Sequence, residues 1–223
     1  MRKNILLFYV FLVFNTSLVS QTKAYTEYGD TIFVYDNGTW SFEELDSAPS
    51  IDEFNFLKRE LSIDTISTLI VTSPESKKEV RNAGDQFTLK YNEKVWSRIP
   101  PANLNEEAEF AFQAKNFDAW CVVISEETKI PMDNLYRIAI NQLEENLNGS
   151  VEILKVELRN INGSQVLRGV SKTEFGGIPI IFDSYYFSNE KGSVQVVTYA
   201  SDVLWEKNKD KIHDLLNGFM VKK

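Results

Sequence analysis

The hydrophobic and polar positions of the second half of the chain predict four successive β-strands. Four segments are rich in β-branched and aromatic residues, and they cover residues 151–159, 165–175, 178–187 and 193–200. The connections between them are short and contain Asn162-Gly163, Gly176-Gly177 and Lys191-Gly192, which tolerate a positive φ angle. Since connections this short place neighbouring strands antiparallel, we expect a four-stranded meander.

Apolar residues at a spacing of three to four predict two helices. The first begins at Pro131 and ends near Gly149, with Met132, Leu135, Ala139, Leu143 and Leu147 along one side. The second is capped by Ser201 or Asp202 and runs to Asn217-Gly218. Its apolar stripe consists of Trp205, Ile212, Leu215, Leu216 and Phe219.

Three more strands are expected before the first helix, at residues 87–91, 109–115 and 117–125. Their apolar content indicates a sheet that is covered on both faces at its centre. The order of strands, helix, meander and helix predicts an α+β domain at residues 81–223, with a central antiparallel β-sheet flanked by helices.

The N-terminal 80 residues divide into three expected segments. Residues 1–20 have a basic start and an apolar run of ten residues, too short for a membrane span, so we predict a secretory signal peptide cleaved after Ser20 or Ala24. Residues 25–45 contain two short β-prone runs around Asn37-Gly38 and predict a β-hairpin. Residues 46–80 are polar and predict a linker, within which 51–61 suits a short helix and 67–72 a strand.

The net charge limits the classes of binding partner, and the cysteine count limits the disulfide bonds. Removing residues 1–20 takes away Arg2 and Lys3 and changes the formal net charge from −8 to −10. Because no basic residues cluster, we expect neither nucleic acid nor an anionic membrane surface as a partner, and no membrane span once the signal is removed. Cys121 is the single cysteine, so no internal disulfide can form, and about 200 residues suffice for a core without one.

Candidate catalytic groups are few. A hydrolase would need Cys121 beside His213, the single histidine, or one of the carboxylate pairs Glu106-Glu107, Glu126-Glu127 and Glu144-Glu145 across a cleft. Cys121 alternates with apolar residues on a strand, which favours a buried thiol, and the carboxylate pairs suit solvated turns and helix faces. No calcium-loop or phosphate-loop motif is present. We therefore predict no enzyme activity, no metal and no cofactor.

Aromatic residues are the candidate binding groups. Tyr185 and Tyr186 point to opposite faces of a strand, so one of them is a candidate for exposure, and Trp205 lies on the closing helix. Exposed aromatic rings form hot spots at interfaces and stack on sugar rings. The alternative for each ring is an ordinary place in the core.

Short modification patterns occur in the chain. Asn-Gly-[Ser/Thr] appears at Asn37, Asn148 and Asn162, which we interpret as two turns and a helix end rather than glycan sites. Asp-[Ser/Thr]-apolar triplets at Thr31, Ser47 and Thr65 match a short pattern for bacterial O-glycosylation, which remains a weaker hypothesis.

Residues 87–219, roughly 60% of the chain, resemble the PsbP-like family, whose fold also includes a eukaryotic Ran-binding nuclear import factor. The resemblance is carried by order and pattern, in FTLKYNEKVW, IPMDNLYRIAINQLEENL, NGSQVLRGVSKTEFGGIPIIFDSYYF, GSVQVVTYA and a last helix ending LLNGF. It implies an α/β/α sandwich and a role in docking to or assembling larger complexes. The family offers no catalytic motif to carry over.

Three functions follow as hypotheses. The first is an exported, periplasmic or extracellular, non-enzymatic module that binds an envelope protein or helps to assemble a complex, through an exposed apolar or aromatic patch on the meander or the closing helix. The second is a periplasmic protein that binds a small ligand in a cleft between the sheet and the 132–147 helix. The third is a hydrolase built on Cys121 and His213 or on a carboxylate pair.

Overall fold

The structure, a computed structural model, describes residues 21–26, 30–35, 39–45 and 51–222. The chain divides into a unit at Met1–Asn55 and a larger unit at Phe56–Lys223, and each is treated separately below. The predicted signal peptide and the predicted Asn37-Gly38 turn lie outside the described residues.

The first unit contains a three-stranded antiparallel sheet rather than a hairpin alone. Strand β2 (Thr31–Tyr35) pairs with β3 (Trp40–Ser41), as the alternation predicts, and also with β1 (Gln21–Tyr25). Trp40 lies on β3 and Phe42 just after it. Their rings make an edge-to-face contact with centroids 5.2 Å apart. Both rings are largely exposed within the described residues.

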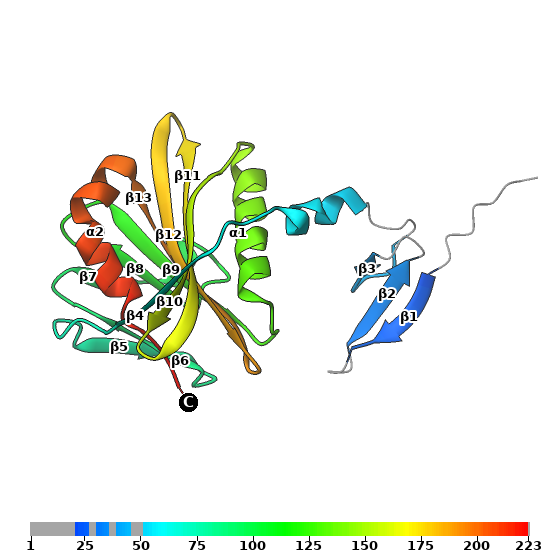
Figure 1. Ribbon diagram of the computed structural model, residues 1–223, viewed down its shortest axis with the longest axis horizontal. Helices are drawn as coiled ribbons and strands as arrows, with labels where there is room; N and C mark the ends of the chain where they lie inside the picture. Colours follow the sequence, from blue (N-terminus) through cyan, green and yellow to red (C-terminus); the bar gives the residue numbers. More distant parts are fainter. Residues whose placement is uncertain (1–20, 27–29, 36–38, 46–50, 223) are drawn as a thin grey trace, which may run out of the picture. The chain divides into compact units, whose positions relative to one another are not determined.

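An eight-stranded sheet dominates the second unit, in the order β4-β10-β11-β12-β13-β9-β8-β7 (Figure 1). Its strands are β4 (Asp64–Ile70), β7 (Trp96–Ile99), β8 (Phe110–Ala114), β9 (Ala119–Glu126), β10 (Glu152–Ile161), β11 (Ser164–Phe175), β12 (Ile178–Asn189) and β13 (Gly192–Ser201). The predicted meander is confirmed as β10 to β13, each strand antiparallel to the next.

The sheet is mixed, which corrects the expectation of a purely antiparallel one. Edge strand β4 runs parallel to β10 and pairs Glu157 with Asp64. This strand lies inside the range 46–80 that the sequence predicts as a linker, as do the 3-10 helix η1 (Ile51–Lys58) and β5 (Lys78–Arg81). The short helix and the strand that the sequence suggests at 51–61 and 67–72 overlap η1 and β4, and the polar composition of the range reflects an edge strand whose side chains are mostly exposed.

Two tight turns of the meander have the backbone conformation that their sequences predict. Asn162 and Gly163 have φ angles of 50° and 84°, and Gly176 and Gly177 have 57° and 83°. Positive φ at both central residues is the requirement of a type I′ hairpin turn. Asn148, with φ of 47°, ends the first helix in the left-handed conformation, one residue before the glycine expected to do so.

Helices α1 (Met132–Leu147) and α2 (Asp202–Leu216) pack on opposite faces of the sheet. Tyr185 and Tyr186 are neighbours on β12 and point to opposite faces, and they lie in different apolar clusters, with α2 residues and with α1 residues respectively. The face under α2 also carries a small sheet of β5, β6 (Phe87–Tyr91) and β14 (Phe219–Val221). Its Leu89 and Phe219 join the same core cluster as α2.

Candidate functional site

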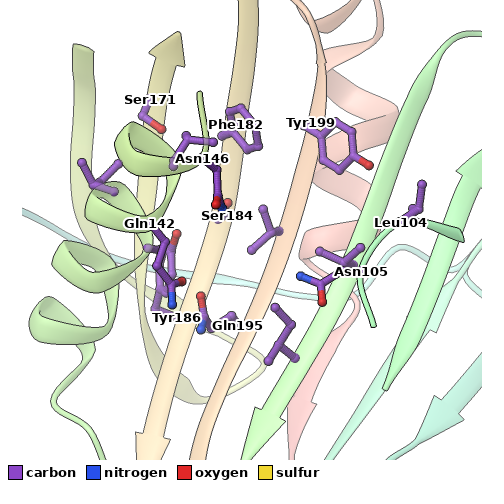
Figure 2. A pocket seen from close by; sticks show the side chains of 16 residues that line it. Leu104, Asn105, Gln142, Asn146, Ser171, Phe182, Ser184, Tyr186, Gln195 and Tyr199 are labelled. Atoms are coloured by element: carbon purple, nitrogen blue, oxygen red, sulfur yellow. The ribbon is translucent and has the colours of Figure 1, made fainter. Parts of the chain in front are cut away.

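A groove runs along the α1 face of the sheet, beside α1. This helix contacts β11 and β12, whereas the same face of β13 and β9 has no helix over it in the described structure. The far wall comes from Leu104 and Asn105, which follow the 3-10 helix η2 (Pro101–Asn103). Figure 2 shows Gln142 and Asn146 on α1, with Asn105 across the groove from them. A cleft between the sheet and this helix is the feature that the ligand-binding hypothesis requires.

The floor of the groove is a regular grid, because strand pairing places alternate side chains in rows across the sheet. One row contains Tyr186, Gln195 and Ile124, and the next contains Ser184, Val197 and Val122. Ser171 lies beside Phe182 on the edge of a third row. Four of these floor residues are buried polar ones, namely Ser171, Ser184, Tyr186 and Gln195. They define the polar end of the groove, a cavity of about 270 Å³.

A row of three stacked rings bounds this polar end. Phe182 lies 5.5 Å from Tyr199, and Tyr199 lies 5.6 Å from Trp120, measured between ring centroids. The ring planes of the two pairs are inclined by only 27° and 23°. Each ring comes from a different strand of one row, β12, β13 and β9, so the strand register itself assembles the stack.

Beyond the stack lies an apolar end of about 520 Å³. It is walled by Leu143 and Leu147 of α1 and by Phe175 and Ile180 of the β11–β12 hairpin, with Thr173 as a polar member. Leu104, Leu143, Phe182 and Tyr199 line both ends, so the two cavities form one continuous groove. Pockets of this size with apolar walls and a few polar groups are the usual form of ligand sites.

The electrostatic character of the groove is neutral. Among the described residues that line it, none is Asp, Glu, Lys, Arg or His, although 25% of the chain is charged. Burial raises the pKa of Tyr199 to about 12 and also raises the pKa of Tyr186, so both phenols stay protonated at neutral pH.

Gln195 is a polar floor residue whose side-chain amide faces the groove. Its side chain is 8% exposed and makes no hydrogen bond with any described residue, and Figure 2 shows it on the groove floor beside Tyr186. Its amide atoms are not among the fully buried ones that lack a partner, so they face the open groove. A ligand that covers them must replace their hydrogen bonds to water. The groove therefore has an amide group available for a ligand.

The aromatic residues predicted from sequence to bind are not exposed. Tyr185, Tyr186 and Trp205 are 1%, 3% and 7% exposed, which corrects the expectation of an aromatic surface patch. Both tyrosines are covered because each face of the sheet carries a helix at this point. The Tyr185 hydroxyl donates to Asn217 Oδ1 at 2.7 Å, and Trp205 Nε1 donates to Asp183 Oδ2 at 3.3 Å. Tyr186 alone lines the groove.

Among the described residues, the groups considered for hydrolysis are not brought together as a catalytic dyad or as a carboxylate pair across the groove. Cys121 is fully buried on β9, burial raises the pKa of its thiol, and no hydrogen bond joins it to His213 among the described residues. Glu106, Glu107 and Glu145 are exposed, and Glu144 forms an ion pair with Arg59 at 2.7 Å. Within the described ranges, no three His, Cys, Asp or Glu side chains gather in a way that suits a metal ion.

One carboxylate pair does line a separate cavity. Glu126 and Glu127 border a space of about 210 Å³ together with Glu109. Glu109 accepts hydrogen bonds from the Ala83 backbone N–H at 2.9 Å and the Ser125 hydroxyl at 2.6 Å, so its oxygens hold two loops together. We assign no chemistry to this cavity.

On the α2 face, sequence reasoning missed a buried ionic cluster. Asp183 is fully buried and receives two hydrogen bonds from Arg168, at 2.7 and 2.6 Å. His213 Nε2 lies 3.0 Å from Asp183 Oδ2 and 2.9 Å from Arg168 Nη2, and Arg168 also reaches Glu157 at 3.2 Å. Burial opposes the charged form of Asp183, but the hydrogen bonds from Arg168 and His213 outweigh it and lower its pKa. The cluster ties α2 to the meander.

The comparisons with known proteins agree with this architecture. No protein-family profile and no curated protein matches the chain. Among solved structures, cyanobacterial PsbP from Synechocystis is similar with a TM-score of 0.54 at 13% identity, over 67% of this chain and 95% of that one. The Saccharomyces cerevisiae Ran-binding protein Mog1p (0.46, 12% identity, 65% and 94% covered) and Mycobacterium tuberculosis LpqN (0.45, 12%, 66% and 90%) are similar too.

The likeness to cyanobacterial PsbP shows that the second unit has the PsbP-like fold, a mostly β structure with two helices and a large mixed sheet. No helix in the described part of the chain has the length and apolar character needed to cross a membrane.

Proposed function

We propose that this chain is an exported, non-enzymatic binding module of the bacterial cell envelope, and that the groove between α1 and the sheet is its binding site. The observation that carries the proposal is the groove itself, with buried polar residues at one end and apolar walls at the other. Pocket volume, apolar walls and a few polar groups that face the pocket are together characteristic of a ligand site. Export is supported by the signal-like pattern of residues 1–20.

A co-purification experiment tests the binding site. Leu143 lines both ends of the groove, so Leu143→Trp fills it, whereas Glu145→Trp places the same ring two residues along α1 outside the lining. The full chain is expressed in a bacterium, purified without detergent and measured by native mass spectrometry. We expect a released small molecule from the wild type and from Glu145→Trp, and none from Leu143→Trp. A bound molecule that persists in Leu143→Trp, or its absence from all three proteins, contradicts the proposal.

Export is tested by the intact mass of the purified protein. A product that lacks residues 1–20 or 1–24 and is recovered from the periplasm or the medium supports the proposed location. A full-length product confined to the cytoplasm argues against it.

A second candidate function is contact with an envelope protein, and a different observation favours it. Phe175 and Ile178, which flank the β11–β12 turn, are 65% and 55% exposed, and Val203 at the start of α2 is 78% exposed. Ile180 pairs with Ser201, so these side chains extend from the same end of β12 and β13. Exposed apolar residues grouped in this way mark interaction surfaces.

Crosslinking in cell-envelope extracts distinguishes this second candidate. We expect a specific partner band that is lost when Ile178, which does not line the groove, is replaced by Ser. The control is Leu69→Ser, which removes a residue of similar exposure from edge strand β4. Equal crosslinking by all three proteins excludes the hairpin as the contact surface.

A further inference from the structure

The two ends of the groove differ in chemistry, and the difference specifies a ligand with two parts. At the polar end, the side chains of Gln195, Ser184 and Tyr186 rise from the floor, and Gln142 and Asn146 border the space from α1 (Figure 2). These groups offer amide and hydroxyl hydrogen bonds in both directions, donating and accepting. A head group that is rich in hydroxyls or amides satisfies them, and an apolar group there leaves Gln195 unpaired.

The absence of charge in the described lining excludes an ionic head group. A phosphate or carboxylate is normally met by Arg, Lys or a helix N-terminus, and an ammonium group by a carboxylate. Desolvating an ion in a groove that offers no counter-charge costs more than neutral hydrogen bonds return. The head group that fits this end is therefore uncharged.

At the other end the walls accept only apolar material. Leu143, Leu147, Phe175 and Ile180 face a space of about 520 Å³, and the hydroxyls that line it are those of Thr173 and, at the junction with the polar end, Tyr199. Between the two ends, Tyr199 and Trp120 combine an apolar ring with a polar tip, which is the character that suits the junction of an apolar tail and a polar head. The apolar end also continues to the exposed side chain of Phe175, so a tail need not be fully enclosed.

We infer, building on the proposed function, that the groove binds a neutral amphiphile, a lipid with one apolar tail and an uncharged head group bearing hydroxyls. The head lies against Gln195, Ser184 and Tyr186, and the tail lies between α1 and the β11–β12 hairpin. The stacked rings of Phe182, Tyr199 and Trp120 contact the region where the two parts join.

A matched set of probes tests the head group. The mature chain is titrated calorimetrically with dodecyl maltoside, dodecyl phosphate and dodecyltrimethylammonium, each below its critical micelle concentration, and with maltose alone. The tail is constant, so the affinities report the head. We expect dodecyl maltoside to bind at least about tenfold more tightly than either charged probe, and maltose alone to bind more weakly still.

Substitutions of Gln195 test whether the head group lies against the groove floor. Gln195→Leu removes the amide that faces the groove and is expected to weaken the binding of dodecyl maltoside about tenfold. Gln195→Glu adds a carboxylate and is expected to reverse the preference toward dodecyltrimethylammonium. Gln165→Glu, the same change at an exposed position of β11 outside the groove, leaves all affinities unchanged. Melting temperatures of the variants show that each is folded.

The outcomes separate this inference from the proposed function. If a charged probe binds as tightly as dodecyl maltoside and its binding is lost in Leu143→Trp, the neutral head group is wrong but the groove remains the binding site. If no probe binds in a way that Leu143→Trp abolishes, the amphiphile is excluded, and absence of any co-purified molecule then excludes the groove as well.

Discussion

Asp183 shows how much one residue contributes to the second unit. Its carboxylate is fully buried on β12 and accepts hydrogen bonds from Arg168 on the next strand and from Trp205 on α2. Replacing it by Asn removes the carboxylate that receives two hydrogen bonds from the buried Arg168, whose remaining carboxylate partner is Glu157 at 3.2 Å. We expect Asp183→Asn to lower the free energy of unfolding by about 3–5 kcal/mol, measured by urea denaturation. The exposed Asp210→Asn on α2 is the control, with an expected change within about 0.5 kcal/mol. Equal stability of the two variants contradicts a structural role for the cluster.

Gly169 is a second residue with a specific requirement. A Cβ atom added there would lie 2.4 Å from the Tyr136 ring of α1, with no space for either to remain in place. We expect Gly169→Ala to displace Tyr136, to lower stability by about 1–3 kcal/mol and to alter the groove wall. Gly84→Ala, where the nearest atom is 3.5 Å away, serves as the control in the same thermal-denaturation experiment. A Gly169→Ala protein as stable as the control shows that α1 does not pack this closely.

The alternation of inward and outward side chains along β11 and β12 explains how much of the ionic cluster the sequence predicts. Arg168 and Asp183 occupy inward positions of their strands, two residues from the buried Val166, Val170, Ile181 and Tyr185. That parity is visible in QVLRGV and IIFDSY, and it is the signal that locates the ionic cluster. Arg168 meets Asp183 because of the register between their strands, and His213 meets both because of the position of α2. The alternation of apolar and polar residues determines neither the register nor the helix position.

The β11–β12 hairpin illustrates what a turn requires of its residues. Gly176 and Gly177 both have positive φ, and a Cβ atom at either position would meet nothing within 4 Å, so conformation alone limits substitution. We expect Ala-Ala at 176–177 to lower stability by about 1–2 kcal/mol per residue and Asn-Gly to leave it nearly unchanged. Thermal denaturation followed by circular dichroism measures both. Equal melting temperatures of the two variants contradict the type I′ assignment.

The elements predicted from sequence are those with strong local patterns. Apolar and polar residues alternate along the meander strands, and apolar residues recur every three to four positions in both helices. Asn-Gly and Gly-Gly mark two turns of the meander. The strand predicted at 67–72 overlaps β4, but its place in the sheet is not predicted, because its partner β10 lies far along the chain and no local pattern encodes a parallel partner. The cleft between the sheet and the 132–147 helix was anticipated as a site for a ligand, whereas its lining residues follow from the strand register.

At the scale of the whole molecule, the buried carboxylates make stability depend on pH. Hydrogen bonds from Arg168 and His213 lower the pKa of Asp183 in spite of its burial, and Lys155, Arg159 and Arg168 do the same for Glu157. A carboxylate whose pKa is lower in the folded state stabilises that state above its unfolded pKa, near 4, and this contribution is lost as the pH falls through the folded value.

We therefore expect the free energy of unfolding to be constant from pH 7 to about 5 and to decrease below about 4. Urea denaturation at a series of pH values measures this. In the Asp183→Asn variant the free energy of unfolding decreases less on acidification, because of the two buried carboxylates only Glu157 still titrates. A wild-type stability that rises on acidification contradicts the assignment of both carboxylates as charged.

The central claim is that the molecule binds its ligand in the groove between α1 and the sheet, and not on the α2 face. Backbone amide shifts of the ¹⁵N-labelled mature chain, recorded while dodecyl maltoside is added, test it most directly. The account predicts that the largest shifts occur at Phe182, Ser184, Gln195, Val197 and Tyr199, and that they disappear in Leu143→Trp. Shifts concentrated on α2 and β14, or shifts unaffected by Leu143→Trp, contradict it.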